Sequence, residues 1–230
     1  EADIEHTAAP AYGIVTTIDE VAEAVMPAAP AVDTGPIAPP DDLGHAADLT
    51  LPGGLSPVLG FVGSQRFSGE SDDFLNAGHT PDLALENGTI TLGFNADAIT
   101  GYDVLFSKDA SGNGDGGHLT AFVTEGGDLK VRSQSKTGEM WFVGRDVVEV
   151  GKEHEFVFTF GADGAQLILD GNVLDEEDGW SVGLANNEEL FLIGANGQRS
   201  GPGELGNPRD YFEGTITDFA LYDTQDGFLI

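Results

Sequence analysis

Cysteine is absent from the chain of 230 residues, and basic residues are scarce. Without cysteine the protein has no disulfides and no thiolate ligands for metals. Only 9 Lys and Arg stand against 40 Asp and Glu, which gives a formal charge of -31. A surface of this sign repels phosphate backbones and anionic lipids, so nucleic acid and bare membrane are excluded as natural partners.

Long apolar runs are also missing, and no segment approaches the roughly 20 apolar residues of a membrane span, so membrane insertion is not expected. The composition nevertheless includes 40% hydrophobic residues with 14 Phe, which is enough for a packed core. A strongly acidic surface suits salty water, where repulsion is screened. We therefore expect a secreted or cell-surface protein, from a bacterium of a saline environment.

Residues 1–58 differ in composition from the rest of the chain. Eight of the eleven prolines lie there, and the first basic residue is Arg66. This composition predicts an extended acidic arm or linker. One short helix is expected between Thr17 and Pro27, because Thr17 and Glu20 have capping-box spacing. Such an arm packs either on its own domain or on a neighbouring subunit, which would give self-association.

From residue 59 the hydrophobic pattern changes to a period of two, and this holds to residue 230. Alternating segments separated by Gly, Asp and Asn occur at 89–96, 118–134, 155–172, 189–197 and 212–223. Short strands at such intervals predict an all-β domain, built as an antiparallel β-sandwich. No further helix is expected.

Individual turn and core residues support the predicted β-sandwich. Asp170-Gly171 is suited to a tight hairpin turn with positive φ, and Gly194 lets a strand bend or approach a neighbour closely. The last apolar segment is expected to supply four core residues, Phe212, Ile216, Phe219 and Leu221.

Several stretches, in this order, carry a family resemblance: RFSGESDDFLNAG, TITLGFNA, VLFSK, QLILDGNVL and FEGTITDFALYD. Over residues 59–224 the chain resembles the laminin G-like, pentraxin-like branch of the concanavalin A-like jelly rolls. The resemblance implies a jelly-roll domain at 59–230 that follows the arm. One departure is Glu153-His154, where family members carry Trp-His.

Two places are candidate calcium sites. Asp109, Ser111 and Asn113 have the spacing of the first half of an EF-hand loop, and Asp115 continues it. However, Thr120 stands where the bidentate Glu belongs, and an Asp/Gly-rich turn is the alternative interpretation.

The resemblance implies a second ion site. There Asp73, or its neighbour Asp72, would share calcium with Asp218, because the first and last strands lie side by side. Ordinary solvent-facing carboxylates are the alternative.

Four residues are candidates for ligand binding. Trp141 and Trp180 are the only tryptophans, and an indole ring stacks on the apolar face of a sugar, although core packing is the alternative. Arg199 and Arg209 could clamp an acidic glycan, or they could neutralise nearby carboxylates such as Asp210.

Catalysis is not expected. Glu153/Glu155 and Glu70/Asp72 have the i, i+2 spacing of glucanase carboxylates, yet neither pair falls in a convincing cleft strand. The preferred hypothesis is therefore a non-catalytic recognition or adhesion module that binds a glycan or an extracellular protein, with calcium as a candidate cofactor. The alternatives are a structural, self-assembling protein whose arm docks on a neighbouring subunit, and a polysaccharide-degrading enzyme.

Overall fold

The computed structural model describes residues 55–109, 114, 116–197 and 203–225. The arm predicted over residues 1–58, with its short helix, lies outside these residues except for its last four positions. Its self-association therefore stays a prediction. Within the described ranges, no helix is long and apolar enough to cross a bilayer.

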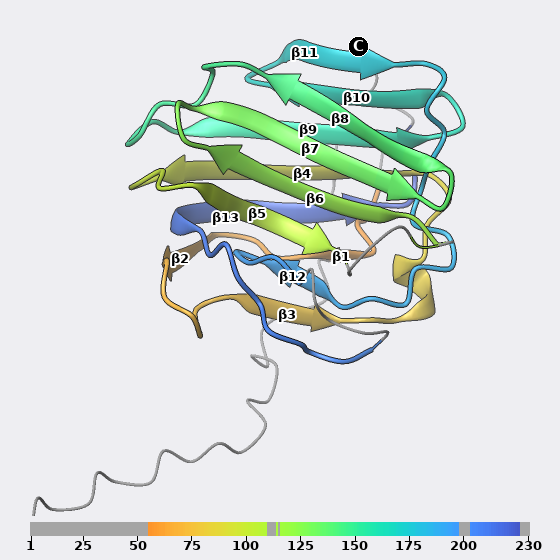
Figure 1. Cartoon of the computed structure of the whole chain (residues 1–230), viewed down its shortest axis with the longest axis horizontal. Helices are drawn as coiled ribbons and strands as arrows, with labels where there is room; N and C mark the ends of the chain where they lie inside the picture. The colour runs from red at the N-terminus through yellow and green to blue at the C-terminus, as the bar shows by residue number, and fades with distance from the viewer. Residues whose placement is uncertain (1–54, 110–113, 115, 198–202, 226–230) are drawn as a thin grey trace, which may run out of the picture. The chain divides into compact units, whose positions relative to one another are not determined.

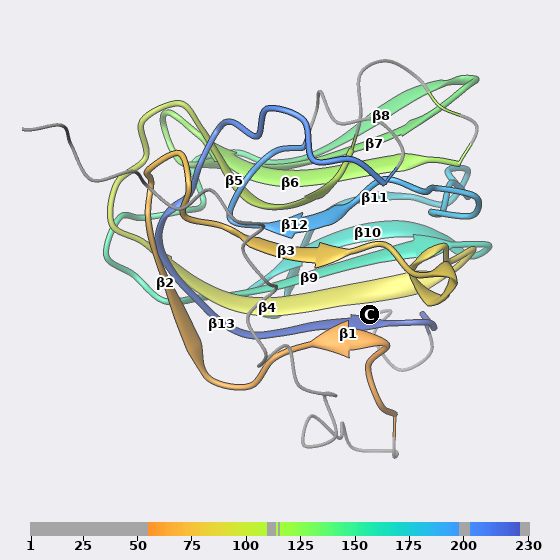
Figure 2. The same ribbon diagram turned by 90° about the horizontal axis from the view of Figure 1, so that it is seen from below.

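The described chain forms two antiparallel sheets that face each other (Figures 1 and 2). The seven-stranded sheet has the order β1 (Leu59–Gly60), β13 (Glu213–Tyr222), β4 (Gly88–Ala96), β9 (His154–Gly161), β10 (Gly164–Leu169) and β11 (Asn172–Glu177), and β2 (Ser64–Ser68) also pairs with β13. The six-stranded sheet has the order β3 (Leu75–Gly78), β12 (Phe191–Ile193), β5 (Tyr102–Lys108), β6 (His118–Thr124), β7 (Asp128–Ser135) and β8 (Gly138–Gly144). One 3-10 helix, η1 (Pro81–Leu83), is the only helical element of the described part. The predicted all-β sandwich is confirmed.

Phenylalanine rings fill the space between the sheets. The ring of Phe106 on β5 lies 5.7 Å from that of Phe156 on β9 and 6.2 Å from that of Phe219 on β13, so it joins the two layers. Burying each such ring contributes on the order of 1.5–3 kcal/mol. The four core residues predicted in the last strand are all inaccessible to solvent: Phe212, Ile216, Phe219 and Leu221.

Two turn predictions are also confirmed. Asp170 and Gly171 have φ angles of 52° and 74° and connect β10 to β11. Gly194 follows β12 with a φ of 84°, and a Cβ atom placed on it would lie 2.7 Å from the Phe67 ring. Gly194 is thus required both for its left-handed backbone and for the close approach of that ring.

Both described ends of the connection from β12 to β13 run beside β5 (Figure 2). Asn196 forms an antiparallel bridge with Arg209, and Val104 of β5 forms a parallel bridge with Tyr211. These contacts place Asn196 and residues 209–211 beside β5.

A charged side chain, Lys108, is fully buried at the end of β5, which no pattern in the sequence predicts. Its Nζ donates to the carbonyl oxygen of Glu189 at 2.5 Å and lies 3.1 Å from His79 Nδ1. Burial lowers the pKa of Lys108 to about 8, although the nearby Glu189 carboxylate acts in the opposite direction. Burial likewise lowers the pKa of His79 and raises that of Glu189.

We expect Gly194→Ala to lower the free energy of unfolding by about 3 kcal/mol. Alanine is strained at the positive φ, and its Cβ atom clashes with the Phe67 ring. Gly126→Ala is the matched control, since Gly126 has a φ of 93° with no atom within 4 Å of the added Cβ. It should cost only the backbone part, about 1–2 kcal/mol. Urea denaturation measures both. Equal losses in the two variants would show that the ring contact at Gly194 costs nothing.

Lys108 should make stability depend on pH. Its pKa is about 8 in the folded protein against 10.5 for the free side chain, so the unfolded chain binds more protons between these values. The free energy of unfolding should therefore gain about 2 kcal/mol from this group between about pH 7.5 and about pH 9.5. Lys108→Met should remove that gain, whereas Lys152→Met, at an exposed position, should keep it. Denaturant titrations at both pH values test this, and an unchanged gain in Lys108→Met would contradict it.

Candidate functional site

The outer face of the six-stranded sheet carries a hollow of about 340 Å³. Strands β5 to β8 supply one part of its lining, and the connection from β12 to β13 supplies the other. The register of the sheet explains the first part, because Thr120, Arg132 and Trp141 lie directly opposite one another on β6, β7 and β8. Directly opposite residues share a face of the sheet.

Three aromatic rings form a row along this hollow. Tyr102 and Trp141 are 60% and 40% exposed, whereas Phe122 between them is only 5% exposed. The Phe122 ring meets that of Tyr102 at 5.3 Å and that of Trp141 at 5.9 Å, both edge to face. A supported aromatic ring that remains open to solvent is a suitable platform for an apolar ligand face.

Two arginines border the hollow, each bound to a carboxylate. Arg132 Nε donates to Glu139 Oε2 at 3.2 Å, and its guanidinium lies 5.4 Å from the centre of the Trp141 ring. Arg209 Nε lies 3.3 Å from Asp210 Oδ2. Arg209 therefore does neutralise Asp210, as the alternative interpretation has it, and it also lines the hollow.

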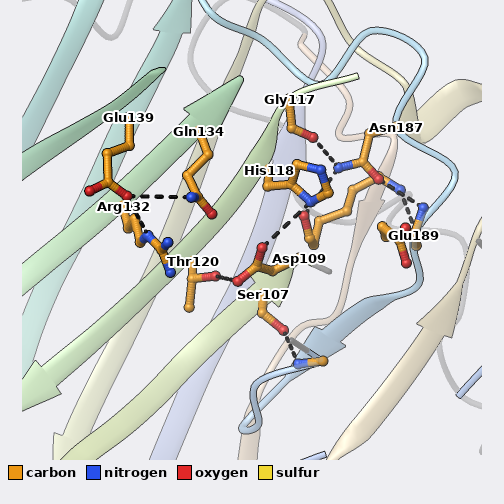
Figure 3. A network of polar contacts seen from close by, with 12 residues as sticks. Ser107, Asp109, Gly117, His118, Thr120, Arg132, Gln134, Glu139, Asn187 and Glu189 are labelled. Atoms are coloured by element: carbon orange, nitrogen blue, oxygen red, sulfur yellow. Dashed lines mark hydrogen bonds and ion pairs between the residues drawn. The ribbon is translucent and has the colours of Figure 1, made fainter. Parts of the chain in front are cut away.

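Asp109, the first residue of the candidate calcium loop, lies in the same hollow. Its side chain is 2% exposed; its Oδ2 accepts from Thr120 Oγ1 at 3.1 Å, and its Oδ1 lies 3.5 Å from His118 Nδ1 (Figure 3). Burial lowers the pKa of His118, although the Asp109 carboxylate opposes this.

One buried amide holds the two ends of the candidate calcium loop together. Asn187 Nδ2 donates to the carbonyl oxygens of Lys108 and Gly117, at 3.1 and 2.5 Å. The other three candidate ligands, Ser111, Asn113 and Asp115, lie outside the described residues. In the described part of the chain, no three His, Asp or Glu side chains are arranged to hold a metal ion. Calcium binding by this loop stays a prediction.

Of the other two ligand-binding candidates, the structure describes only Trp180, which is not in the hollow. Trp180 packs against the core, and its indole Nε1–H donates to Ser133 Oγ at 2.9 Å. Since Ser133 and Arg132 are adjacent on β7, they face opposite sides of the sheet, and so do Trp180 and Trp141. Arg199 lies outside the described residues.

The structure does not bring Asp73 and Asp218 together. Asp73 Oδ2 accepts from the Ser68 N–H, and Asp218 Oδ1 accepts from the Gly63 N–H, each at 2.7 Å. These partners lie at opposite ends of β2, whose five residues span about 13 Å. The first and last strands do pair, but the two carboxylates are too far apart for one ion.

A larger hollow, of about 820 Å³, lies on the outer face of the seven-stranded sheet and includes Glu153 and Glu155. None of its described lining residues is an exposed aromatic. His154, between the two glutamates, is buried, with Nδ1 2.9 Å from Asp170 Oδ2 and Nε2 accepting from the Glu149 N–H. This histidine is fixed by its own chain, so the smaller hollow is the better candidate site.

Sequence reasoning missed the other residues that define the site, Tyr102, Phe122, Arg132 and Glu139. Their alternation along four strands is visible in the sequence. The sequence does not show which face of the sheet is the outer one, or that Asn196 and residues 209–211 lie beside β5.

Similarity to known proteins agrees with this fold. The chain resembles the CBM40 of Ruminococcus gnavus IT-sialidase, solved with α2,3 sialyllactose, with a TM-score of 0.59 and 14% identity over 73% of this chain and 93% of that one. It also resembles the heptameric SAP-like pentraxin of Limulus polyphemus (TM-score 0.52, 13% identity, 70% and 76% covered) and domains LG4-5 of the mouse laminin α1 chain (0.50, 17%, 71% and 41%). No curated protein matches this sequence.

A family model decides the classification. The Laminin_G_3 model, described as the concanavalin A-like lectin/glucanases superfamily, matches residues 68–225, which is more than half of the chain. The order of the predicted strands, the two antiparallel sheets and this match agree, and the protein belongs to the laminin G-like family of the concanavalin A-like lectin/glucanase superfamily.

Proposed function

We propose that the protein is a non-catalytic, secreted or cell-surface recognition module that binds a glycan in the hollow on its six-stranded sheet. One observation carries the proposal: the exposed rings of Trp141 and Tyr102 border a hollow that also contains hydrogen-bonding side chains. Sugars have an apolar ring face and polar edges, and they need this combination.

The hollow fits one sugar unit of a longer chain. Its volume of about 340 Å³ is at the lower end of the range for small-molecule sites, roughly 300–1,000 Å³. In this proposal the Trp141 indole packs on the apolar face of the sugar. Asn196, Asp210 and Arg209 lie on the opposite side, where hydroxyl or carboxylate groups of the sugar accept and donate hydrogen bonds.

The arginines favour a glycan that carries a carboxylate. Arg132 and Arg209 each use Nε for a carboxylate of this chain, and each has two further nitrogens suited to bidentate contacts. The Ruminococcus gnavus module was solved with a sialylated sugar, which supports acidic glycans as the class to test first.

Binding without catalysis is supported by the two carboxylates in the hollow. Asp109 accepts from Thr120, and Asp210 accepts from Asn196 Nδ2 at 3.2 Å and pairs with Arg209. Both are held as hydrogen-bond acceptors. A glycosidase instead needs one of its two carboxyl groups as a proton donor.

Trp141→Ala should weaken glycan binding at least tenfold, about 1.4 kcal/mol, because the stacking platform is lost. A glycan array with sialylated, uronate-containing and neutral sugars would find the ligand, and titration calorimetry would measure the loss. Val173→Ala, an exposed position on the other sheet, is the control and should bind normally. The proposal would be contradicted if the protein bound no glycan on the array, or if Trp141→Ala bound the glycan with wild-type affinity.

We also propose that calcium assists this site through residues 109–115, because Asp109 belongs both to the candidate loop and to the hollow. Calcium titration calorimetry should detect binding to the wild type. Asp109→Ala and Asp115→Ala should each weaken it about tenfold or more, since a calcium site of six to eight oxygens loses one ligand. Wild-type calcium affinity in both variants would remove this proposal.

A further inference from the structure

We propose that Glu139 is the positioning residue of the glycan site: its carboxylate holds the Arg132 guanidinium over the Trp141 ring, in the orientation that receives the sugar. This inference rests on the proposed function and adds a residue that does not line the hollow. Three observations support it.

The register places four side chains in two adjacent rows. Glu139 and Trp141 are two residues apart on β8, so they point to the same face. Their partners on β7 are Gln134, directly opposite Glu139, and Arg132, directly opposite Trp141. Glu139 is therefore the acidic corner of a group of four neighbouring side chains.

Glu139 binds the two members of this group that lie on β7. Its Oε2 accepts from Arg132 Nε at 3.2 Å and from Gln134 Nε2 at 3.3 Å (Figure 3). The nearby Trp141 indole and these two donors lower the pKa of Glu139. A single carboxylate thus holds the guanidinium that lies over the indole ring.

The location of this group makes such a connection necessary. β8 is the edge strand of its sheet, so within the described residues Trp141 has a neighbouring strand on one side only. Phe122 meets its ring edge to face, and Arg132 lies over it. Loss of the Glu139 carboxylate would release the guanidinium from its place over the ring. Ordering it again on binding costs affinity.

The indole N–H resonances provide a direct test, because the chain contains only Trp141 and Trp180. In a ¹H–¹⁵N spectrum of the full chain, Trp141→Ala assigns the two signals. Glu139→Ala should shift the Trp141 signal, because the Arg132 guanidinium no longer has a fixed place over the indole ring. The Trp180 signal should stay in place, since its N–H donates to Ser133. Glu139→Gln, which keeps an acceptor oxygen, should restore most of the wild-type position.

Affinity for the glycan found on the array is the second measurement. Glu139→Ala should weaken binding about fivefold, less than Trp141→Ala, and Glu139→Gln should recover part of the loss. Glu176→Ala is the matched control, because Glu176 also lies on an edge strand and accepts from a glutamine, Gln166, at 3.1 Å. It should change neither the Trp141 signal nor the affinity.

The outcomes separate this inference from the proposed function. An unmoved Trp141 signal in Glu139→Ala overturns the inference, whether or not a glycan binds. A moved signal with unchanged glycan affinity also overturns it, while a loss of binding in Trp141→Ala leaves the proposed function standing. If no glycan binds, the proposed function fails, and the inference fails with it.

Discussion

The structure depends on the face-to-face packing of two twisted sheets around a layer of phenylalanine rings. Phe106 contacts rings of β9, β12 and β13, so one side chain of the six-stranded sheet fixes its distance from the seven-stranded sheet. Every residue that alternates with this layer is turned outward. The side chains of Thr120, Arg132 and Trp141 point to the outer face for that reason, and the hollow is a consequence of the core on the other side.

Much of the fold could be predicted because it is encoded locally. Ile90, Leu92 and Phe94 alternate along β4, and Asp170-Gly171 adopts the positive φ angles that the hairpin demands. The site was predictable only in part, because it joins segments that are distant in the sequence. Trp141 and Arg209 meet at one hollow only because Asn196 and residues 209–211 lie beside β5.

Two residues show why the rest could not be predicted. Nothing in the composition around Trp180 indicates that its N–H bonds to Ser133 instead of facing a ligand. Lys108 ends a strand, where lysine is usually exposed, and its burial depends on the carbonyl of Glu189, which lies far along the chain. Contacts between segments that are distant in the sequence form only in the folded protein, and the local sequence pattern does not predict them.

The outermost strand of the seven-stranded sheet, β11, has a further consequence. It ends in three consecutive acids, Asp175, Glu176 and Glu177, and no strand of the described residues pairs with its outer edge. The backbone groups of such an edge are a template for pairing with a second chain. Two copies that approach along this edge bring six carboxylates into register, so like charge opposes fibril-type growth. Because the protein has only 9 Lys and Arg, the repulsion between these carboxylates is hardly offset, and it opposes pairing of the sheet edge with a second copy.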